Sequence, residues 1–105
     1  MYKIKTPMTT KEIREQHPFR FIVPRGEFYS NLEFDGIKLY NERIKYLREH
    51  KRKGDVKLIS DITGLSQQYI ERSIYMTHHR HHITVIDILD DIVTNREALK
   101  KKYAL

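Results

Sequence analysis

The chain contains no cysteine, and this absence narrows the classes of protein to which it can belong. Without a thiol there is no disulfide scaffold, no thiolate zinc finger and no cysteine nucleophile. No apolar run approaches the roughly 20 residues that a membrane-spanning helix needs. The N-terminal segment MYKIKTPMTT also lacks the apolar centre of a signal peptide. We therefore expect a cytoplasmic protein that does not insert into a membrane.

Glycine is scarce, with four residues in 105, and the glycine-dependent motifs of common enzymes are missing. The chain has no P-loop, no GxSxG turn and no glycine-rich dinucleotide-binding turn. Asp87, Asp90 and Asp91 have a spacing that groups them on a helix, and with lysines nearby we interpret them as a solvated face. We expect no enzymatic activity, no cofactor and no metal.

Positive charge is present in excess, and it is concentrated in one segment. The formal net charge is +6, and residues 36–57 hold eight Lys and Arg against three Asp and Glu. Such a local basic stripe favours a polyanionic partner, although a solvated helix face has the same composition.

The spacing of apolar residues predicts a mainly α fold of two parts. Residues 1–31 form an N-terminal arm that contains a short helix from Thr10 to His17 and a small β-hairpin over residues 19–29. Residues 32–105 form a helical bundle, with helices over 32–51, 56–63, 66–76 and 83–103. Asp35 is the expected cap of the first of these, and Gly54 is expected to separate it from the second.

The second and third helices of this bundle meet the requirements of a helix-turn-helix. A small residue, Ser60, stands where the helices cross, and Gly64 supplies the positive φ of the turn. Leu65 then fills the core, and the hydroxyl of Ser66 caps the next helix. The inward-facing residues are expected to be Ile59, Ile62, Ile70 and Ile74.

This segment resembles the helix-turn-helix of phage repressors and of the related XRE-type regulators. The run Gly-Leu-Ser-Gln-Gln-x-Ile-Glu from Gly64 is similar to the recognition segment of a lambdoid repressor, in which adjacent glutamines contact bases. The resemblance implies that the second helix enters the major groove. It implies base contacts from four outward-facing side chains, Gln67, Gln68, Glu71 and Arg72.

The resemblance also gives the basic stripe a location, beside the helix that crosses the DNA backbone. We expect phosphate contacts from three groups of residues. They are the basic residues Lys51, Arg52, Lys53 and Lys57, the helix-start residues Ser66 and Tyr69, and the loop residues His78, His79 and Arg80.

The run from His78 to His82 is the most unusual local feature. We expect a polar loop, and a contact with the DNA backbone and simple solvation are equally compatible with it. His78 and His82 have a metal-ligand spacing on a helix, but without a supporting HExxH pattern we do not expect a zinc site. Protonation near pH 6 would add positive charge here.

Together these features predict a sequence-specific, double-stranded DNA-binding protein, a regulator of transcription of the phage or bacterial type. The wide apolar surface of the last helix predicts a homodimer that contacts two half-sites. Two alternatives remain open: a DNA-recognition subunit for phage packaging or virion assembly, and a protein–protein module with a basic face. Residues 1–31 fit no repressor pattern and are a candidate contact for a phage or host protein.

Overall fold

The computed structural model describes residues 8–16, 34–77 and 79–104, and within these ranges the chain is helical, without a strand. Its helices are α1 (Thr10–Gln16), α2 (Phe34–His50), α3 (Lys53–Thr63), α4 (Gln67–Tyr75) and α5 (His82–Lys102). The predicted mainly α class is therefore confirmed for the described residues. The predicted hairpin over 19–29 and the residue His78 lie outside them. None of the described helices is long and apolar enough to cross a membrane.

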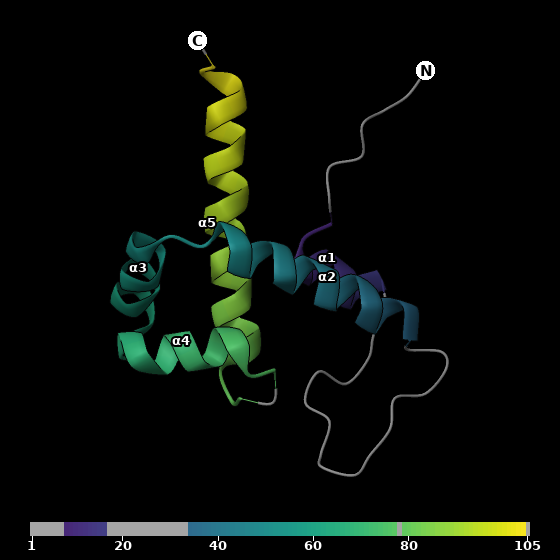
Figure 1. Cartoon of the computed structure of the whole chain (residues 1–105), viewed down its shortest axis with the longest axis horizontal. Coiled ribbons are helices and arrows are strands. Elements are labelled where there is room, and N and C mark those ends of the chain that lie inside the picture. Colours follow the sequence, from purple (N-terminus) through teal and green to yellow (C-terminus); the bar gives the residue numbers. More distant parts are fainter. Residues whose placement is uncertain (1–7, 17–33, 78, 105) are drawn as a thin grey trace.

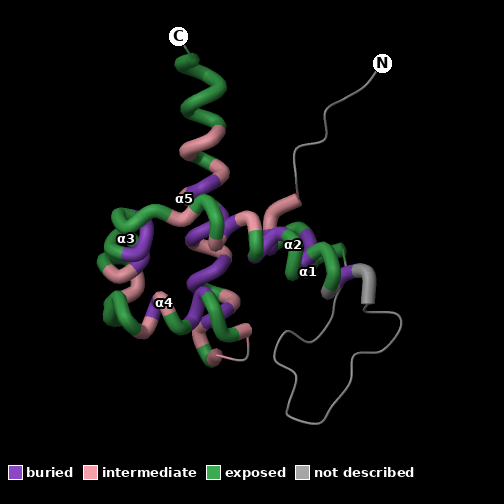
Figure 2. Tube along the Cα trace, in the orientation of Figure 1, coloured by how far each residue is buried: buried purple, intermediate pink, exposed green. Residues whose placement is uncertain are grey.

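The long helix α5 organises the molecule, because it packs against each of the other four helices. In Figure 1 it stands upright, with α3 and α4 on one side and α1 and α2 on the other. A single apolar core joins all five helices, and Figure 2 shows that its α5 part lies in the N-terminal half of that helix. The core residues are Ile13, Tyr40, Ile44, Leu47, Val56, Ile59, Ile70, Ile74, Val85, Ile86, Leu89 and Val93.

The predicted helix boundaries are close to the observed ones, with two exceptions at helix starts. Gly54 lies inside α3 as its second residue, so it does not separate α2 from α3. Asp35 lies inside α2 and does not precede it. The break after α2 comes instead at Lys51 and Arg52, and the Asp55 carboxylate accepts the Arg52 amide hydrogen at 2.8 Å.

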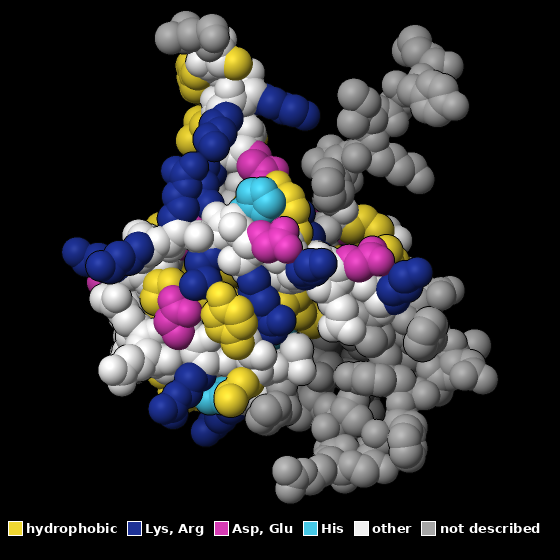
Figure 3. Space-filling model, in the orientation of Figure 1, with side chains coloured by type: hydrophobic (Ala, Val, Ile, Leu, Met, Phe, Trp, Pro, Cys, Tyr) yellow, Lys and Arg dark blue, Asp and Glu magenta, His cyan; other side chains and the backbone are white. Residues whose placement is uncertain are grey.

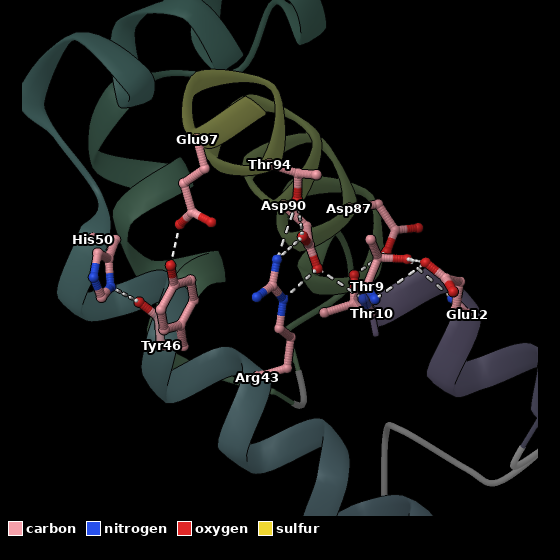
Figure 4. Close-up of polar contacts among 10 residues, drawn as sticks. All are labelled: Thr9, Thr10, Glu12, Arg43, Tyr46, His50, Asp87, Asp90, Thr94 and Glu97. Atoms are coloured by element: carbon pink, nitrogen blue, oxygen red, sulfur yellow. Dashed lines mark hydrogen bonds and ion pairs between the residues drawn. The ribbon is translucent and has the colours of Figure 1, made fainter. Parts of the chain in front are cut away.

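The prediction that Asp87 and Asp90 form a solvated face is wrong. The two carboxylates fasten α1 and α2 to α5: Asp87 pairs with both terminal nitrogens of Arg14, and Asp90 pairs with Arg43 at 2.6 Å. Asp90 also accepts the Thr10 amide hydrogen at 2.7 Å (Figure 4). Asp90 and Arg43 are both buried, and burial of these two charges is possible because each neutralises the other. Asp91 alone of the three is exposed.

Candidate nucleic-acid interface

Helices α3 and α4 are joined by a turn whose conformation its own residues determine. Gly64 has a φ of 76°, the left-handed region that glycine enters without strain, and its amide donates to the Ser60 carbonyl at 2.8 Å. The Ser60 hydroxyl donates to the Leu65 carbonyl at 2.6 Å. The Ser66 hydroxyl accepts the Tyr69 amide hydrogen at 3.2 Å and so caps α4 as predicted.

The packing of these two helices follows the predicted phase for three of the four isoleucines. Ile59, Ile70 and Ile74 are fully buried. Ile62 is 59% exposed, so its predicted contact with α4 is wrong. The turn carries α4 across the end of α3, and only the first of the α3 isoleucines reaches the core.

Burial of one side of α4 leaves the opposite side to solvent, and most of the predicted base-contacting residues lie there. Gln67 and Gln68 occupy the first turn of α4, and both are exposed. Neither side-chain amide is hydrogen-bonded to the described part of the chain, so donors and acceptors of both are available to a ligand. Arg72 is exposed one turn further along.

Glu71, the fourth predicted base contact, is engaged within the protein. Both of its carboxylate oxygens lie 3.2 Å from the Lys51 ammonium, which also stands 5.4 Å from the centre of the Tyr75 ring. Burial lowers the pKa of Lys51, but the hydrogen bond with Glu71 and its charge outweigh burial and raise it. Lys51 therefore ties the end of α2 to α4, and much of its charge is used internally.

The remaining predicted phosphate contacts of the basic stripe are open to solvent. Arg52, Lys53 and Lys57 are all exposed around the first turns of α3. Figure 3 shows Lys and Arg side chains gathered over α3 and along the outer part of α5. The start of α3 already holds a negative charge, because the Asp55 carboxylate lies there and accepts hydrogen bonds from the Arg52 amide and from Arg96, both at 2.8 Å. This carboxylate disfavours a second anion at the α3 amides, so the exposed cationic side chains are the groups available there to an anionic ligand.

One residue that positions α4 was not identified from the sequence. Arg48 of α2 donates to the Ile74 carbonyl from two nitrogens, at 3.1 and 2.9 Å, and its guanidinium stacks over the Tyr75 ring. Burial lowers the pKa of Arg48. A carbonyl in the last turn of a helix lacks an intrahelical donor, so a guanidinium there both caps α4 and fixes its direction. Its charge pattern alone did not distinguish Arg48 from the exposed arginines.

The histidine segment packs against α4 instead of forming a free loop. The Tyr69 hydroxyl lies 2.7 Å from Nδ1 of His81, and the Ser73 hydroxyl lies 3.0 Å from Nδ1 of His79. Both imidazoles also contact the Tyr69 ring edge to face. Tyr69 and His79 are half-buried, whereas Arg80 is exposed, so Arg80 is more accessible to a ligand than His79.

His82 is not part of the loop, contrary to the prediction. It is the first residue of α5 and fully buried. Its Nδ1 donates to the Ser73 carbonyl at 2.6 Å, and its Nε2 lies 3.0 Å from the Tyr40 hydroxyl. Burial lowers the pKa of His82, against a smaller opposite effect of the Ser73 carbonyl. Hydrogen-bonded on both nitrogens, His82 joins α2, α4 and α5.

The candidate interface thus consists of the exposed side of α4 and the exposed basic residues of α3. It presents neutral amide groups flanked by cations. Among the described residues, no group of three or more His, Cys, Asp and Glu side chains is arranged to hold a metal ion. No protein-family model, no curated protein and no solved structure matches this chain.

Proposed function

We propose that this protein binds double-stranded DNA with sequence specificity and acts as a regulator of transcription of the phage or bacterial type. The observation that carries the proposal is the exposure of Gln67 and Gln68 at the capped start of α4, whose other side is anchored in the core. The side-chain amide of glutamine can donate to N7 of adenine and accept from its N6 amino group, which gives a bidentate contact in the major groove.

The cations beside α4 supply the sequence-independent part of the proposed binding. Arg52, Lys53 and Lys57 stand at the start of α3, and Arg80 follows α4. Contacts of this kind fix the orientation of a protein on the duplex but do not distinguish bases. Glu71 and Lys51 position α4 and do not contact DNA in this proposal, because their ion pair holds α4 against the end of α2.

The proposed protein acts by binding alone, without catalysis. A second copy would supply a second α4, so that two half-sites about one helical turn apart are contacted together. Such an arrangement predicts a palindromic target sequence, because the symmetry of the site mirrors that of the protein.

Selection of bound sequences from a random duplex pool, at two salt concentrations, tests this proposal. We expect enrichment of a palindrome that persists at the higher salt concentration. Retention of DNA without enrichment would contradict sequence-specific regulation and favour a role in packaging. Absence of retention at both salt concentrations would contradict DNA binding and favour a protein–protein module.

A further inference from the structure

A second apolar stripe runs along α5 beside the side that faces the core. Its members, spaced by four, three, four and four residues, are Ile88, Ile92, Asn95, Leu99 and Tyr103. Alternation of three- and four-residue steps keeps side chains on one side of a helix and is typical of helix–helix seams. The core-facing residues Val85, Ile86, Leu89 and Val93 form a different stripe.

The outer part of this stripe is uncovered in the described part of the chain. Leu99 is 57% exposed and Tyr103 is 65% exposed, while Ile88 and Ile92 are half-buried. Figure 2 shows that the C-terminal half of α5 extends beyond the other helices. Beside it lies an open groove of about 800 Å³, bordered by Leu58 of α3 together with Ile92 and Leu99. Exposed apolar residues in such a contiguous arrangement mark an interaction site.

The one polar residue within the stripe indicates what covers it. Asn95 is exposed and stands between Ile92 and Leu99. An asparagine within an apolar seam destabilises contact with an apolar partner, but a matching asparagine satisfies its hydrogen bonds and fixes the register. A second copy of α5, related by a two-fold axis near Asn95, supplies that partner.

The charges along α5 decide the direction of the second copy. Asp91 is exposed on one flank of the stripe, and Lys102 is exposed on the same flank near the end of the helix. In an antiparallel pair centred between residues 95 and 96, Asp91 of each copy faces the lysine-rich end of the other. A parallel pair would instead bring Lys100, Lys101 and Lys102 of both copies together, which is repulsive.

We propose that α5 pairs with α5 of a second copy in an antiparallel, two-fold symmetric dimer. Asn95 lies at the axis, Ile92 of each copy packs on Leu99 of the other, and Asp91 lies beside Lys102. The inference rests on the proposed function insofar as it identifies the second copy that contacts the second half-site, but the dimer forms without DNA.

Single cysteines test the geometry, because the chain has none of its own. Under oxidation we expect Asn95→Cys to link to itself, since a disulfide needs Cα atoms within roughly 7 Å. Leu99→Cys alone should not link, because the two copies of this position stand about 10 Å apart along the helix axis. A mixture of Ile92→Cys and Leu99→Cys should link. Lys101→Cys, which lies on the other side of α5, is the matched control and should form no disulfide-linked dimer.

Self-linking of Leu99→Cys, or equal linking of Lys101→Cys, would overturn the antiparallel seam. Sedimentation equilibrium without DNA provides the second measurement. We expect the unmodified chain to dimerise, and Leu99→Asp to lose the dimer while its circular dichroism stays helical. Met76→Asp changes an exposed apolar residue at the end of α4 and should keep the dimer.

Charge exchange then tests the pairing across the seam. Asp91→Lys should raise the dimer Kd several-fold, and Asp91→Lys combined with Lys102→Asp should restore it. A chain that is monomeric at every concentration overturns this inference, even if it selects a DNA sequence. A dimer that retains no DNA overturns the proposed function and leaves the seam intact.

Discussion

At the scale of single residues, His82 has a defined protonation state because of its two partners. The Ser73 carbonyl can only accept, so Nδ1 carries the proton, and Nε2 is left to accept from the Tyr40 hydroxyl. A second proton on Nε2 leaves the contact with Ser73 intact but turns Nε2 into a donor, so the Tyr40 hydroxyl would have to rotate in order to accept from it. Burial disfavours the cation further and lowers the pKa.

We therefore expect stability to fall as the solution is acidified. The unfolded chain holds His82 at an ordinary pKa of about 6.5, so below that pH it binds a proton that the folded state excludes. The contribution of His82 to the free energy of unfolding is therefore constant above about pH 7.5, and it decreases as the pH falls below about 6.5. Nearby charged groups change the pKa of His82 in both directions: Arg48 and His79 lower it, and Asp87 raises it.

Denaturant unfolding of the parent chain and of His82→Gln, between pH 7.5 and pH 5.5, measures this contribution. The variant should be less stable at pH 7.5, and its stability should depend less on pH. Equal pH slopes for the two proteins would mean that His82 is not the group responsible.

Gln67 provides the residue-scale test of specificity. Gln67→Ala should weaken binding at the preferred site by about 1–3 kcal/mol and relax discrimination at one base pair. Affinity for unrelated duplexes should barely change, because the amide does not contact phosphate. Competition binding with single-base variants of the selected site measures both quantities.

Gln16→Ala offers a matched control, because this glutamine is exposed at the end of α1, away from the proposed interface. It should leave both affinities unchanged. A parallel loss of specific and unspecific binding in Gln67→Ala would show that Gln67 does not contact bases.

At the scale of helices, local rules predicted the α3–α4 pair well. The positive φ of Gly64, the cap at Ser66 and the burial of Ile70 all depend on residues within one or two turns. The failures come from contacts distant in sequence. Asp90 is buried in contact with Arg43, which lies 47 positions earlier in the chain. His82 is buried in contact with Tyr40, which lies 42 positions earlier.

The same contrast applies to the candidate site. The sequence predicted the exposed glutamines and cations, because the phase of an amphipathic helix separates its two sides. It did not predict that Glu71 is bound by Lys51, nor that Arg48 caps α4 through the Ile74 carbonyl. Arg48 lies in the last turns of α2 and Lys51 follows directly after it, so both contacts join the end of α2 to α4, and they depend on how these helices pack in the core.

Two isoleucines of this helix pair allow a matched test of the assigned phase. Ile70 is fully buried, so Ile70→Ala should destabilise the fold by roughly 2–5 kcal/mol, the range for a large-to-small change in a core. Ile62→Ala removes the same atoms from an exposed position and should change stability by about 0.5 kcal/mol or less.

Thermal and denaturant unfolding of both variants gives the comparison. Similar destabilisation by the two changes would mean that α3 and α4 are rotated relative to the arrangement described. Loss of DNA binding by Ile70→Ala at a temperature at which it is folded would contradict its purely structural role.

At the scale of the whole molecule, some charged side chains are paired within the fold and others are exposed to solvent. The carboxylates of Asp55, Asp87 and Asp90 are each matched by an arginine inside the fold. The cations at the start of α3 remain exposed, and the excess of positive charge is thereby presented to solvent. The number and positions of charged residues in the sequence do not show which of them are paired within the fold.

The exposed set predicts the salt dependence of binding. Replacing Arg52, Lys53 and Lys57 with Gln should weaken binding to all duplexes by a similar factor. The slope of log affinity against log salt concentration should shrink by up to about 3, since each released phosphate contributes roughly 0.9. Stability should change little, because exposed charges contribute little to it.

A second triple variant serves as the control, because it changes the net charge by the same amount away from α3. It replaces three exposed lysines with Gln: Lys11, Lys38 and Lys45. Its salt slope should remain close to that of the parent chain. Equal reductions in the two triple variants would indicate a general effect of net charge and remove the α3 cations from the interface.

The central claim is that DNA lies against the exposed side of α4 and the start of α3. Titration of the isotopically labelled protein with the selected duplex, followed through amide and side-chain chemical shifts, tests it most directly. We predict the largest changes at Gln67, Gln68, Arg52 and Lys53, including the glutamine side-chain amides, with little change at Asn95 on α5. Changes confined to α1 or α5, with unperturbed glutamine side chains, would contradict the account.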